Sequence, residues 1–391
     1  ILPGGKAVLF TSVTGTDDAS IQVVSLKDRR KKTLQRSGTF GRYLPSGHLL
    51  YVNNGTLFAV AFDLDALEVR GMPVQLPAQV SYNPKSGSAQ LDFSGRASGP
   101  GMLLYRSGGA VGDEVTVEWL DREGKTQPLL AKPGRYEHPR LSPAGPRLAL
   151  EIPAGSTRDV WIYEWQRDTM TRLSFDAGGG WPMNPVWSPD GRYIVFSGKT
   201  GMLWTRSDGA GKPTPLAQSK NPRIQMPYSF MPDGKRLSWM DPEGGPALWT
   251  TVLENDGSGL RSGKSELFLQ DSFAEVSPMF SPDGHWLAYT SNESGMFEVY
   301  VRTFPRGGKW KISNGGGSFP LWSHNGRELF FRSADNRIMV TAYTVKGESF
   351  EVADQPRAWS EKRLSNTGAN FATANFDLAP DGKRVAAIMP V

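Results

Sequence analysis

The chain has 391 residues, of which 38% are hydrophobic and 11% aromatic, enough to build a large core and to exclude wholesale disorder. Its 44 basic and 39 acidic residues leave a net charge of +5, a mild excess from which we expect no nucleic-acid partner. The absence of cysteine excludes disulfide frameworks, thiolate metal sites and cysteine nucleophiles. One dense basic run, residues 27–32, could contact phosphate or anionic lipid, but we interpret it as a solvated turn between two edge strands.

The start of the chain falls inside a repeated motif. Ile1 leads directly into Leu2-Pro3-Gly4-Gly5, with no initiator Met and no signal peptide. No uninterrupted apolar stretch approaches the ~18 residues that a membrane span needs. We therefore expect a processed or excised part of a longer protein, connected to a membrane only through sequence upstream of Ile1.

The motif recurs along the whole chain. It consists of a large apolar residue, a small one, Pro, Asp or a substitute, and Gly, followed by a short β-like run. Its glycines are spaced by roughly 42 to 56 residues, the period of a four-stranded propeller blade. In chain order the copies are Ile1–Gly5, Tyr43–Gly47, a weak unit near Gly99–Gly101, Leu141–Gly145, Trp187–Gly191, Phe230–Gly234, Phe280–Gly284, Trp322–Gly326 and Leu378–Gly382.

Each motif predicts a tight turn between the first two strands of a blade. Pro presets φ at the first corner, Asp hydrogen-bonds back to the turn amides, and Gly takes the position with φ > 0. The large apolar residue four positions before the Gly then points between neighbouring blades. The turn residues of the best copies are Asp190, Gly191, Asp233, Gly234, Asp283, Gly284, Asp381 and Gly382.

The strands of a blade follow the turn in order. Tyr193–Phe196 is typical of a second strand, Asp159–Tyr163 of a third and Thr171–Leu173 of a short fourth strand. No segment shows a sustained helical period. The pattern therefore predicts an all-β fold, a single closed β-propeller over residues 1–391.

Counting the innermost strands predicts eight blades. The last motif has no third or fourth strand after it, so we expect the C-terminal segment to complete the blade begun at the N-terminus and so remove exposed sheet edges. One second strand, Ala7–Val13 or Arg384–Met389, has no place in this scheme, and seven blades result if the weak unit near residues 89–130 is an insertion. The approximate blades are 1–37 with 370–391, 38–80, 81–132, 133–176, 177–219, 220–271, 272–314 and 315–369.

The repeated Ser-Pro-Asp-Gly signature resembles the TolB-like (WD40-like) propeller repeats over essentially the full chain. The stretches Phe280–Gly295, Glu298–Pro305 with Gly315–Gly317, and Gly326–Phe330 look like the propeller that follows the kinase domain and membrane helix in many bacterial receptor-like serine/threonine kinases, notably of acidobacterial type. This resemblance implies an extracytoplasmic sensor or interaction region, periplasmic or at the cell surface, separated from its kinase.

Catalytic motifs are missing from this sequence. The glycine-rich loop, the lysine strand and the His-Arg-Asp and Asp-Phe-Gly elements of a kinase are absent, as is the Gly-x-Ser-x-Gly elbow of a serine hydrolase. The stretches Gly209–Gly211 and Gly315–Gly317 are interpreted as linkers rather than phosphate loops. We expect no catalytic residue and no cofactor.

Metal binding is also not expected. Three of the four histidines, His48, His285 and His324, fall in motif turns, and His138 alone precedes an innermost strand, where it could face the channel. We interpret His138 as a hydrogen-bonded structural residue and the motif aspartates as turn-capping groups, so no metal ligand is assigned.

Function is expected at the mouth of the central channel, where the loops before the innermost strands converge. Those loops mix aromatic with hydrogen-bonding side chains, a composition suited to a peptide, glycan or small ligand, although the aromatics could equally pack between blades. The candidate binding residues are Tyr136, His138, Trp181, Asn184, Phe273, Glu275, Phe319 and Asn370.

The sequence thus favours a non-catalytic, monomeric binding module for a protein, peptide or envelope ligand. Two alternatives remain open. The first is a structural scaffold that self-associates, and the second is an enzyme of lactonase or lyase type with a channel metal.

Overall fold

The computed structural model describes residues 1–13, 19–83, 87–94, 102–107, 114–154, 157–175, 183–199, 201–216, 224–241, 247–255, 257, 259–365 and 374–391. Over these ranges the chain forms β-strands and turns, and the one helical element is a 3₁₀ turn at Pro3–Gly5. The all-β prediction is therefore confirmed. None of the described segments forms a helix of the length and hydrophobicity needed to cross a bilayer.

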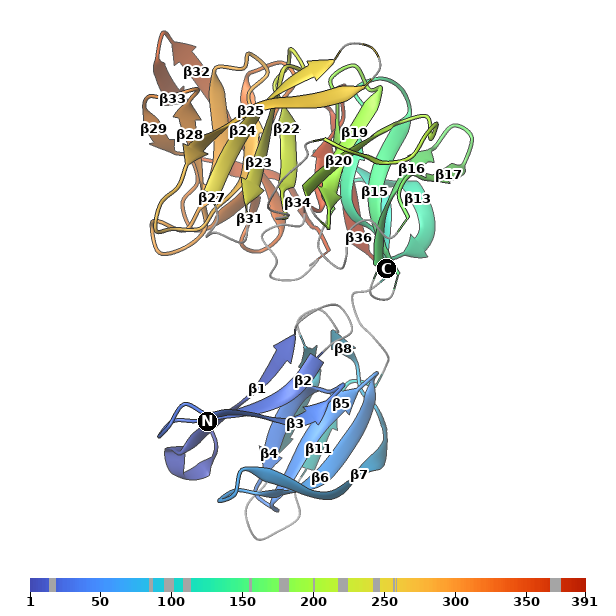
Figure 1. Cartoon of the computed structure of the whole chain (residues 1–391), viewed down its shortest axis with the longest axis vertical. Helices are drawn as coiled ribbons and strands as arrows, with labels where there is room; N and C mark the ends of the chain where they lie inside the picture. Colours follow the sequence, from blue (N-terminus) through green and yellow to red (C-terminus); the bar gives the residue numbers. More distant parts are fainter. Residues whose placement is uncertain are drawn as a thin grey trace. The chain divides into compact units, whose positions relative to one another are not determined.

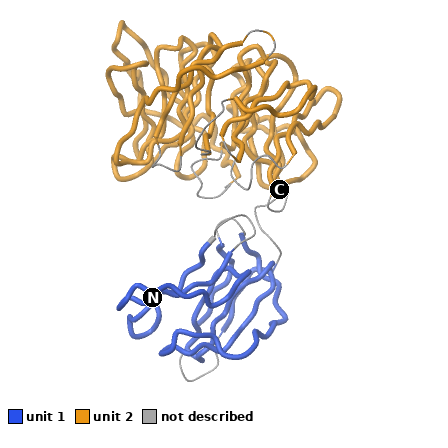
Figure 2. Tube along the Cα trace, viewed as in Figure 1, with its two compact units in different colours: residues 1–113 blue, residues 114–391 orange. Residues whose placement is uncertain are grey.

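The chain divides into two compact units, residues 1–113 and 114–391 (Figure 2). This differs from the prediction of one domain over residues 1–391. The predicted blade 81–132 contains parts of both units, because its first strands belong to unit 1 and its last strands to unit 2.

Unit 2 consists of six sheets, which we call blades A to F (Figure 1). Blade A contains β12 (Val115–Asp121), β13 (Thr126–Gly134), β35 (Phe376–Leu378) and β36 (Arg384–Pro390); blade B β14 (Glu137–Leu141), β15 (Arg147–Ala154), β16 (Thr157–Glu164) and β17 (Thr169–Arg172); blade C β18 (Val186–Trp187), β19 (Tyr193–Gly198), β20 (Gly201–Arg206) and β21 (Thr214–Pro215); blade D β22 (Met226–Phe230), β23 (Arg236–Asp241), β24 (Ala247–Asn255) and β25 (Leu260–Leu269); blade E β26 (Glu275–Phe280), β27 (Trp286–Ser291), β28 (Glu298–Thr303) and β29 (Lys309–Lys311); and blade F β30 (Gly317–Trp322), β31 (Glu328–Ser333), β32 (Arg337–Lys346), β33 (Ser349–Val352) and β34 (Arg357–Arg363).

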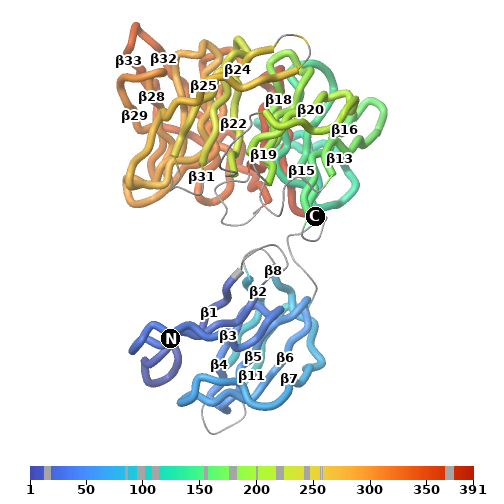
Figure 3. Tube along the Cα trace, viewed as in Figure 1, coloured from blue at the N-terminus to red at the C-terminus, as the bar shows by residue number. Residues whose placement is uncertain are grey.

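Blade A joins the two ends of unit 2. Strand β36 pairs antiparallel with β12, from Val115 opposite Pro390 to Asp121 opposite Arg384. In Figure 3 the red strand β36 accordingly lies with the green strands at the start of unit 2. The predicted pairing of residues 370–391 with residues 1–37 is therefore wrong. The unplaced second strand at 384–389 is the second strand of blade A.

The six blades close into a ring because each buried cluster of unit 2 is shared by two successive blades. The clusters join A with B, B with C, C with D, D with E, E with F and F with A. Strand β19 shows how the sequence does this: Ile194 and Phe196 face blade B, whereas Tyr193 and Val195 face blade D. The alternation of a strand thus supplies apolar side chains to both neighbours. The described residues form six blades here, not the eight or seven predicted for the whole chain.

The first residue of the motif links neighbouring blades, as predicted. The indole Nε1 of Trp187 donates to the carbonyl of Arg140 in blade B at 2.9 Å, and Trp322 donates to Met279 of blade E at 2.9 Å. Both bonds hold the innermost strand of one blade against that of the previous blade.

The motif aspartates bind the backbone of their own turns. Each carboxylate accepts a hydrogen bond from the N–H two residues further on, at 2.9 to 3.0 Å. The following Gly has a positive φ, for example +68° at Gly191 and +73° at Gly284. Both features belong to the turn between the first two strands of a blade.

Unit 1 is a stack of smaller sheets. Strands β1 (Ala7–Val13), β2 (Ala19–Ser25) and β3 (Lys31–Arg36) form one sheet, and β4 (Thr39–Leu44), β5 (His48–Asn53), β6 (Thr56–Asp63) and β7 (Glu68–Gln79) form another; β8 (Tyr82–Asn83) pairs with β9 (Ser88–Ala89), and β10 (Leu91–Ser94) with β11 (Met102–Tyr105). The first two sheets bury Ile21, Val23, Leu49 and Tyr51 between them. Gly41 allows this close contact, because a Cβ there would lie 2.7 Å from Ile21.

The pairing of β36 with β12 predicts that residues 114–391 fold without residues 1–113. We expect this fragment to unfold in one cooperative transition and to keep the near-ultraviolet circular dichroism of its packed tryptophans, because no strand of unit 1 takes part in blades A to F. The comparison is the shorter fragment 114–375, which lacks β35 and β36. Its unfolding transition should lose cooperativity, because the edge of β12 is left unpaired. An unfolded 114–391 fragment would contradict the observed closure.

Candidate functional site

The innermost strands of unit 2 share a strained position, three residues before the large apolar residue of the motif. In blades B, C, E and F this residue has a left-handed backbone, with φ of +50° at His138, +44° at Asn184, +56° at Ser277 and +55° at Phe319. A β-bulge accompanies it in three of these strands, β14, β26 and β30. Each strained residue precedes a proline, which has no N–H left unpaired by the bulge.

The bulges are held from neighbouring segments. Asn184 donates from Nδ2 to the carbonyl of Pro227 in blade D, and Ser238 of blade D donates from Oγ to the carbonyl of Pro278 in blade E at 2.7 Å. Left-handed residues cost about 1–3 kcal/mol each and persist where the surroundings determine them. The channel wall is therefore a rigid scaffold.

A small cavity lies among the innermost strands of blades B, D, E and F. This cavity has a volume of only ≈10 Å³, about the space of a single water molecule. It is lined by Arg140, Tyr228, Ser277, Met279, Phe319, Pro320, Leu321 and Ala374. This cavity is therefore too small for a ligand larger than water.

The structure places most predicted binding residues inside the protein. His138 and Asn184 are 0% exposed, Glu275 1%, Phe319 4% and Tyr136 7%. Phe273, by contrast, is 40% exposed in the loop before β26. Trp181 and Asn370 lie outside the described residues. Of the predicted set that the structure describes, Phe273 thus offers the largest surface to a partner.

Burial explains what these side chains do instead. Tyr136 packs in the cluster between blades A and B and donates its hydroxyl to the carbonyl of Lys132 at 3.1 Å. Glu275 accepts a hydrogen bond from Ser291 Oγ at 3.0 Å. Aromatic composition in a loop did not separate packing from binding, because both uses favour the same residue types.

A buried group of four ionisable side chains lies in blade B. His138 and Glu137 are on β14, Glu151 is on β15 and Arg158 is on β16. Nδ1 of His138 lies 2.9 Å from Glu151, and Arg158 pairs with both Glu137, at 2.7 Å, and Glu151. Burial alone would raise the pKa of Glu151, but the hydrogen bond and charge of His138, together with Arg158, hold it at about 2.

This buried group also fixes the start of blade C, because Glu151 accepts a hydrogen bond from the backbone N–H of Met183 at 2.8 Å. Potential ligand atoms of Glu137, His138 and Glu151 lie within 4.8 Å of one another, a set that could hold a metal ion. The guanidinium of Arg158, however, already bonds both carboxylates and offsets part of their charge. The arrangement is therefore that of a structural ion-pair network, in which a cation would have to displace Arg158.

Sequence reasoning considered His138 alone and missed its partners. The available signal was a charged residue within an apolar strand, Glu151 in Leu148-Ala149-Leu150-Glu151-Ile152. A buried carboxylate needs a partner.

Removal of Arg158 tests the network. Arg158→Met leaves two carboxylates buried together, so we expect a loss of about 3–5 kcal/mol in the free energy of unfolding, measured by urea denaturation. The matched control is Arg167→Met, which removes an arginine with 76% side-chain exposure and should change stability by less than about 0.5 kcal/mol. Equal effects of the two changes would contradict the structural role of Arg158.

Glu275, at the start of β26, makes the stability of the folded protein depend on pH. Burial, aided by the charge of Glu293, raises the pKa of Glu275 to about 7. Because the folded-state pKa lies above the unfolded value, the contribution of Glu275 to stability is complete below about pH 4.5 and is lost as pH rises through about 7. We expect Glu275→Gln to remove this loss and to gain about 2 kcal/mol over the wild type between about pH 5 and pH 8, as measured by denaturation at each pH. Parallel pH profiles for the two proteins would contradict this prediction.

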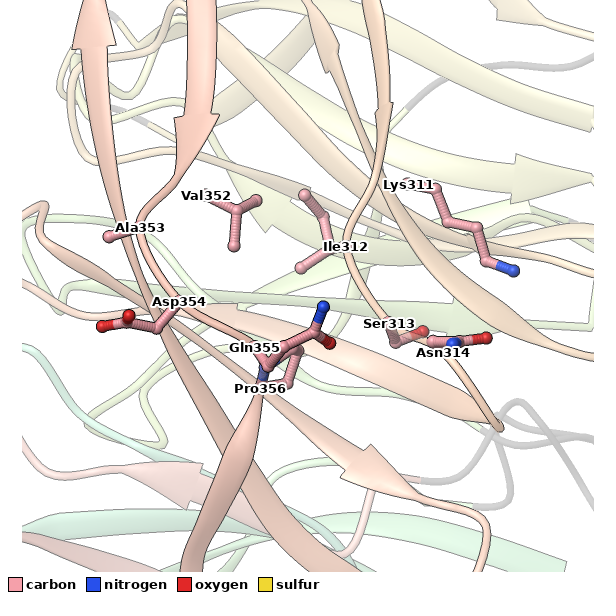
Figure 4. A pocket seen from close by; sticks show the side chains of 9 residues that line it. All are labelled: Lys311, Ile312, Ser313, Asn314, Val352, Ala353, Asp354, Gln355 and Pro356. Carbon is pink, nitrogen blue, oxygen red and sulfur yellow. The ribbon is translucent and has the colours of Figure 1, made fainter.

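A larger groove lies between blades E and F, with a volume of ≈560 Å³. It forms because the outer strand of blade F is split: β33 pairs with the end of β32, and β34 pairs with its beginning. Figure 4 shows the lining segments 311–314 and 352–356 on the two sides. The sequence predicted one ordinary blade for residues 315–369 and therefore missed this groove.

The groove carries polar groups of both signs. Asn314, Asp354 and Gln355 are exposed, and Lys311 lies 3.4 Å from the buried carboxylate of Glu298. The lysine is therefore partly neutralised from within blade E, and the groove has no single charge by which to select a ligand.

The closed ring of blades A to F and the repeated turn motif together define a β-propeller. No protein-family model matches the sequence. Among solved structures, a TolB candidate from Agrobacterium tumefaciens is similar at 17% identity with a TM-score of 0.50, covering 71% of this chain and 98% of that one. A candidate 6-phosphogluconolactonase from Bacteroides uniformis has 16% identity and a TM-score of 0.47, covering 70% and 89%. TolB from Acinetobacter baumannii has 12% identity and a TM-score of 0.41, covering 98% and 80%. At these identities the likeness concerns the fold.

Proposed function

We propose that this chain is a non-catalytic binding module that recognises a protein, peptide or envelope ligand at the mouth of the unit 2 channel. The observation that carries the proposal is an exposed aromatic side chain in a loop that leads into an innermost strand. Phe273, in the loop before β26, exposes 40% of its surface. Exposed aromatic side chains on a rigid frame are typical anchors of protein recognition.

The resemblance to the propellers of receptor-like serine/threonine kinases supports a cellular context. In this proposal the chain is the monomeric, extracytoplasmic region of such a kinase, and the catalytic domain lies in another part of the protein. Binding at the mouth would then be the event that the kinase reports.

Self-association as a scaffold is the second candidate. It is favoured by β11 in unit 1, an apolar strand in which Met102 and Leu104 are 70% and 71% exposed. Apolar strands of this kind pair readily with other chains. Light scattering separates the candidates, since a scaffold would form a stable oligomer.

A lactonase or lyase with a channel metal is the third alternative, which metal analysis of chelator-free protein addresses.

Phe273→Ala tests recognition at the mouth. We expect the variant to lose most of its capture of envelope components in a crosslinking experiment, because an interface anchor contributes about 2 kcal/mol or more, while its Tm stays unchanged. The control is Leu267→Ala, which removes an apolar side chain of similar exposure, 46%, from the outer strand of blade D. Equal capture by both variants would contradict recognition through Phe273.

A further inference from the structure

Arg332 is a charged residue without a charged partner at the channel mouth. It lies on β31 opposite Ser318, near the beginning of the innermost strand β30. Its guanidinium lies over the ring of Phe319, 4.6 Å from the centroid, and Phe319 lines the channel. Among the described residues no acidic side chain forms an ion pair with Arg332, and its Nη1 is buried without a hydrogen-bond acceptor.

Two buried arginines of blade B, by contrast, have carboxylate partners. Arg158 pairs with Glu137 and Glu151, and Arg140 lies 3.6 Å from Asp377. The contrast matters because a buried charge without a partner is costly, and folded proteins rarely keep one without use. Burial accordingly lowers the pKa of Arg332 to about 10, so that it remains charged at neutral pH.

The acid nearest in the chain to Arg332 has other partners. Asp335, in the turn after β31, lies 2.9 Å from Arg337 and 3.5 Å from Arg363. The attraction between Phe319 and the guanidinium is also insufficient, since a cation over an aromatic ring recovers only part of the lost hydration. The positive charge of Arg332 therefore has no balancing carboxylate among the described residues.

We propose that Arg332, held over Phe319, binds a carboxylate of the ligand at the channel mouth. The proposal rests on the proposed function and names the chemistry of its ligand. A planar guanidinium offers paired N–H groups to the two oxygens of a carboxylate, and one such group balances the single charge. The carboxylate belongs to an acidic side chain or to the C-terminus of a peptide, and the test separates these sources.

Nuclear magnetic resonance titration of the full chain with small probes tests the proposal, followed at the backbone N–H of Phe319. The probes are acetyl-Ala-Glu-Ala-amide for a side-chain carboxylate, acetyl-Ala-Ala-Ala with a free C-terminus, acetyl-Ala-Gln-Ala-amide as the neutral control, and inorganic phosphate. We expect a saturable shift with one or both carboxylate probes, and affinity at least about tenfold weaker in Arg332→Met. Arg167→Met, which removes the same charge from an exposed site, should bind as the wild type does.

Stability distinguishes a binding role from a structural one. Arg332→Met should keep or raise the Tm, because it removes an uncompensated charge, and Arg332→Lys should retain weakened binding. Unchanged carboxylate binding in Arg332→Met would overturn the proposal, as would equal binding of the neutral probe or binding of phosphate alone. These outcomes are independent of the Phe273 experiment: capture that needs Phe273 without carboxylate binding overturns only the role of Arg332, and carboxylate binding without capture overturns only the wider recognition proposal.

Discussion

The ring of unit 2 depends on one strand pairing, that of β36 with β12. Every other blade of the ring is built from consecutive strands, whereas blade A joins residues from the beginning and the end of the unit. The hairpin β35–β36 supplies the two inner strands, and β12 with β13 supplies the two outer ones. Because the cluster between blades F and A and the cluster between A and B both contain residues of this composite blade, its assembly completes the core on two sides at once.

Local features of the fold could be predicted from the sequence, whereas the long-range pairing could not. The motif fixes its turn through contacts within five residues, such as Asp190 with the N–H of Arg192, so turns and all-β character follow from spacing alone. The same motif also occurs in unit 1, at Tyr43–Gly47, and does not say which strands share a ring. Whether the final hairpin pairs with β1 or with β12 depends on packing between segments distant in sequence. The count of blades failed for that reason.

The burial of most candidate binding residues could not be predicted from the sequence. Composition selected the loops before the innermost strands, yet His138 and Asn184 prove to be fully buried: both have a left-handed backbone, His138 lies against Glu151, and Asn184 donates to Pro227. Charge partners were also hidden, since Glu151 and Arg158 belong to strands whose pairing the motif does not report. Conversely, Arg332 looks ordinary in the sequence. Its isolation becomes visible only when the acids of unit 2 have been assigned to their partners.

The composite blade has a consequence for the synthesis of the protein. Val115 and Pro390 are partners at opposite ends of unit 2, so the outer pair β12–β13 leaves the ribosome long before the hairpin that must cover it. Blades B to F can form in order as they emerge, because their strands are consecutive. During that time the open edge of β12 is exposed to other chains. The ring can therefore close only after β36 has emerged from the ribosome, and the open edge of β12 needs protection by chaperones until then.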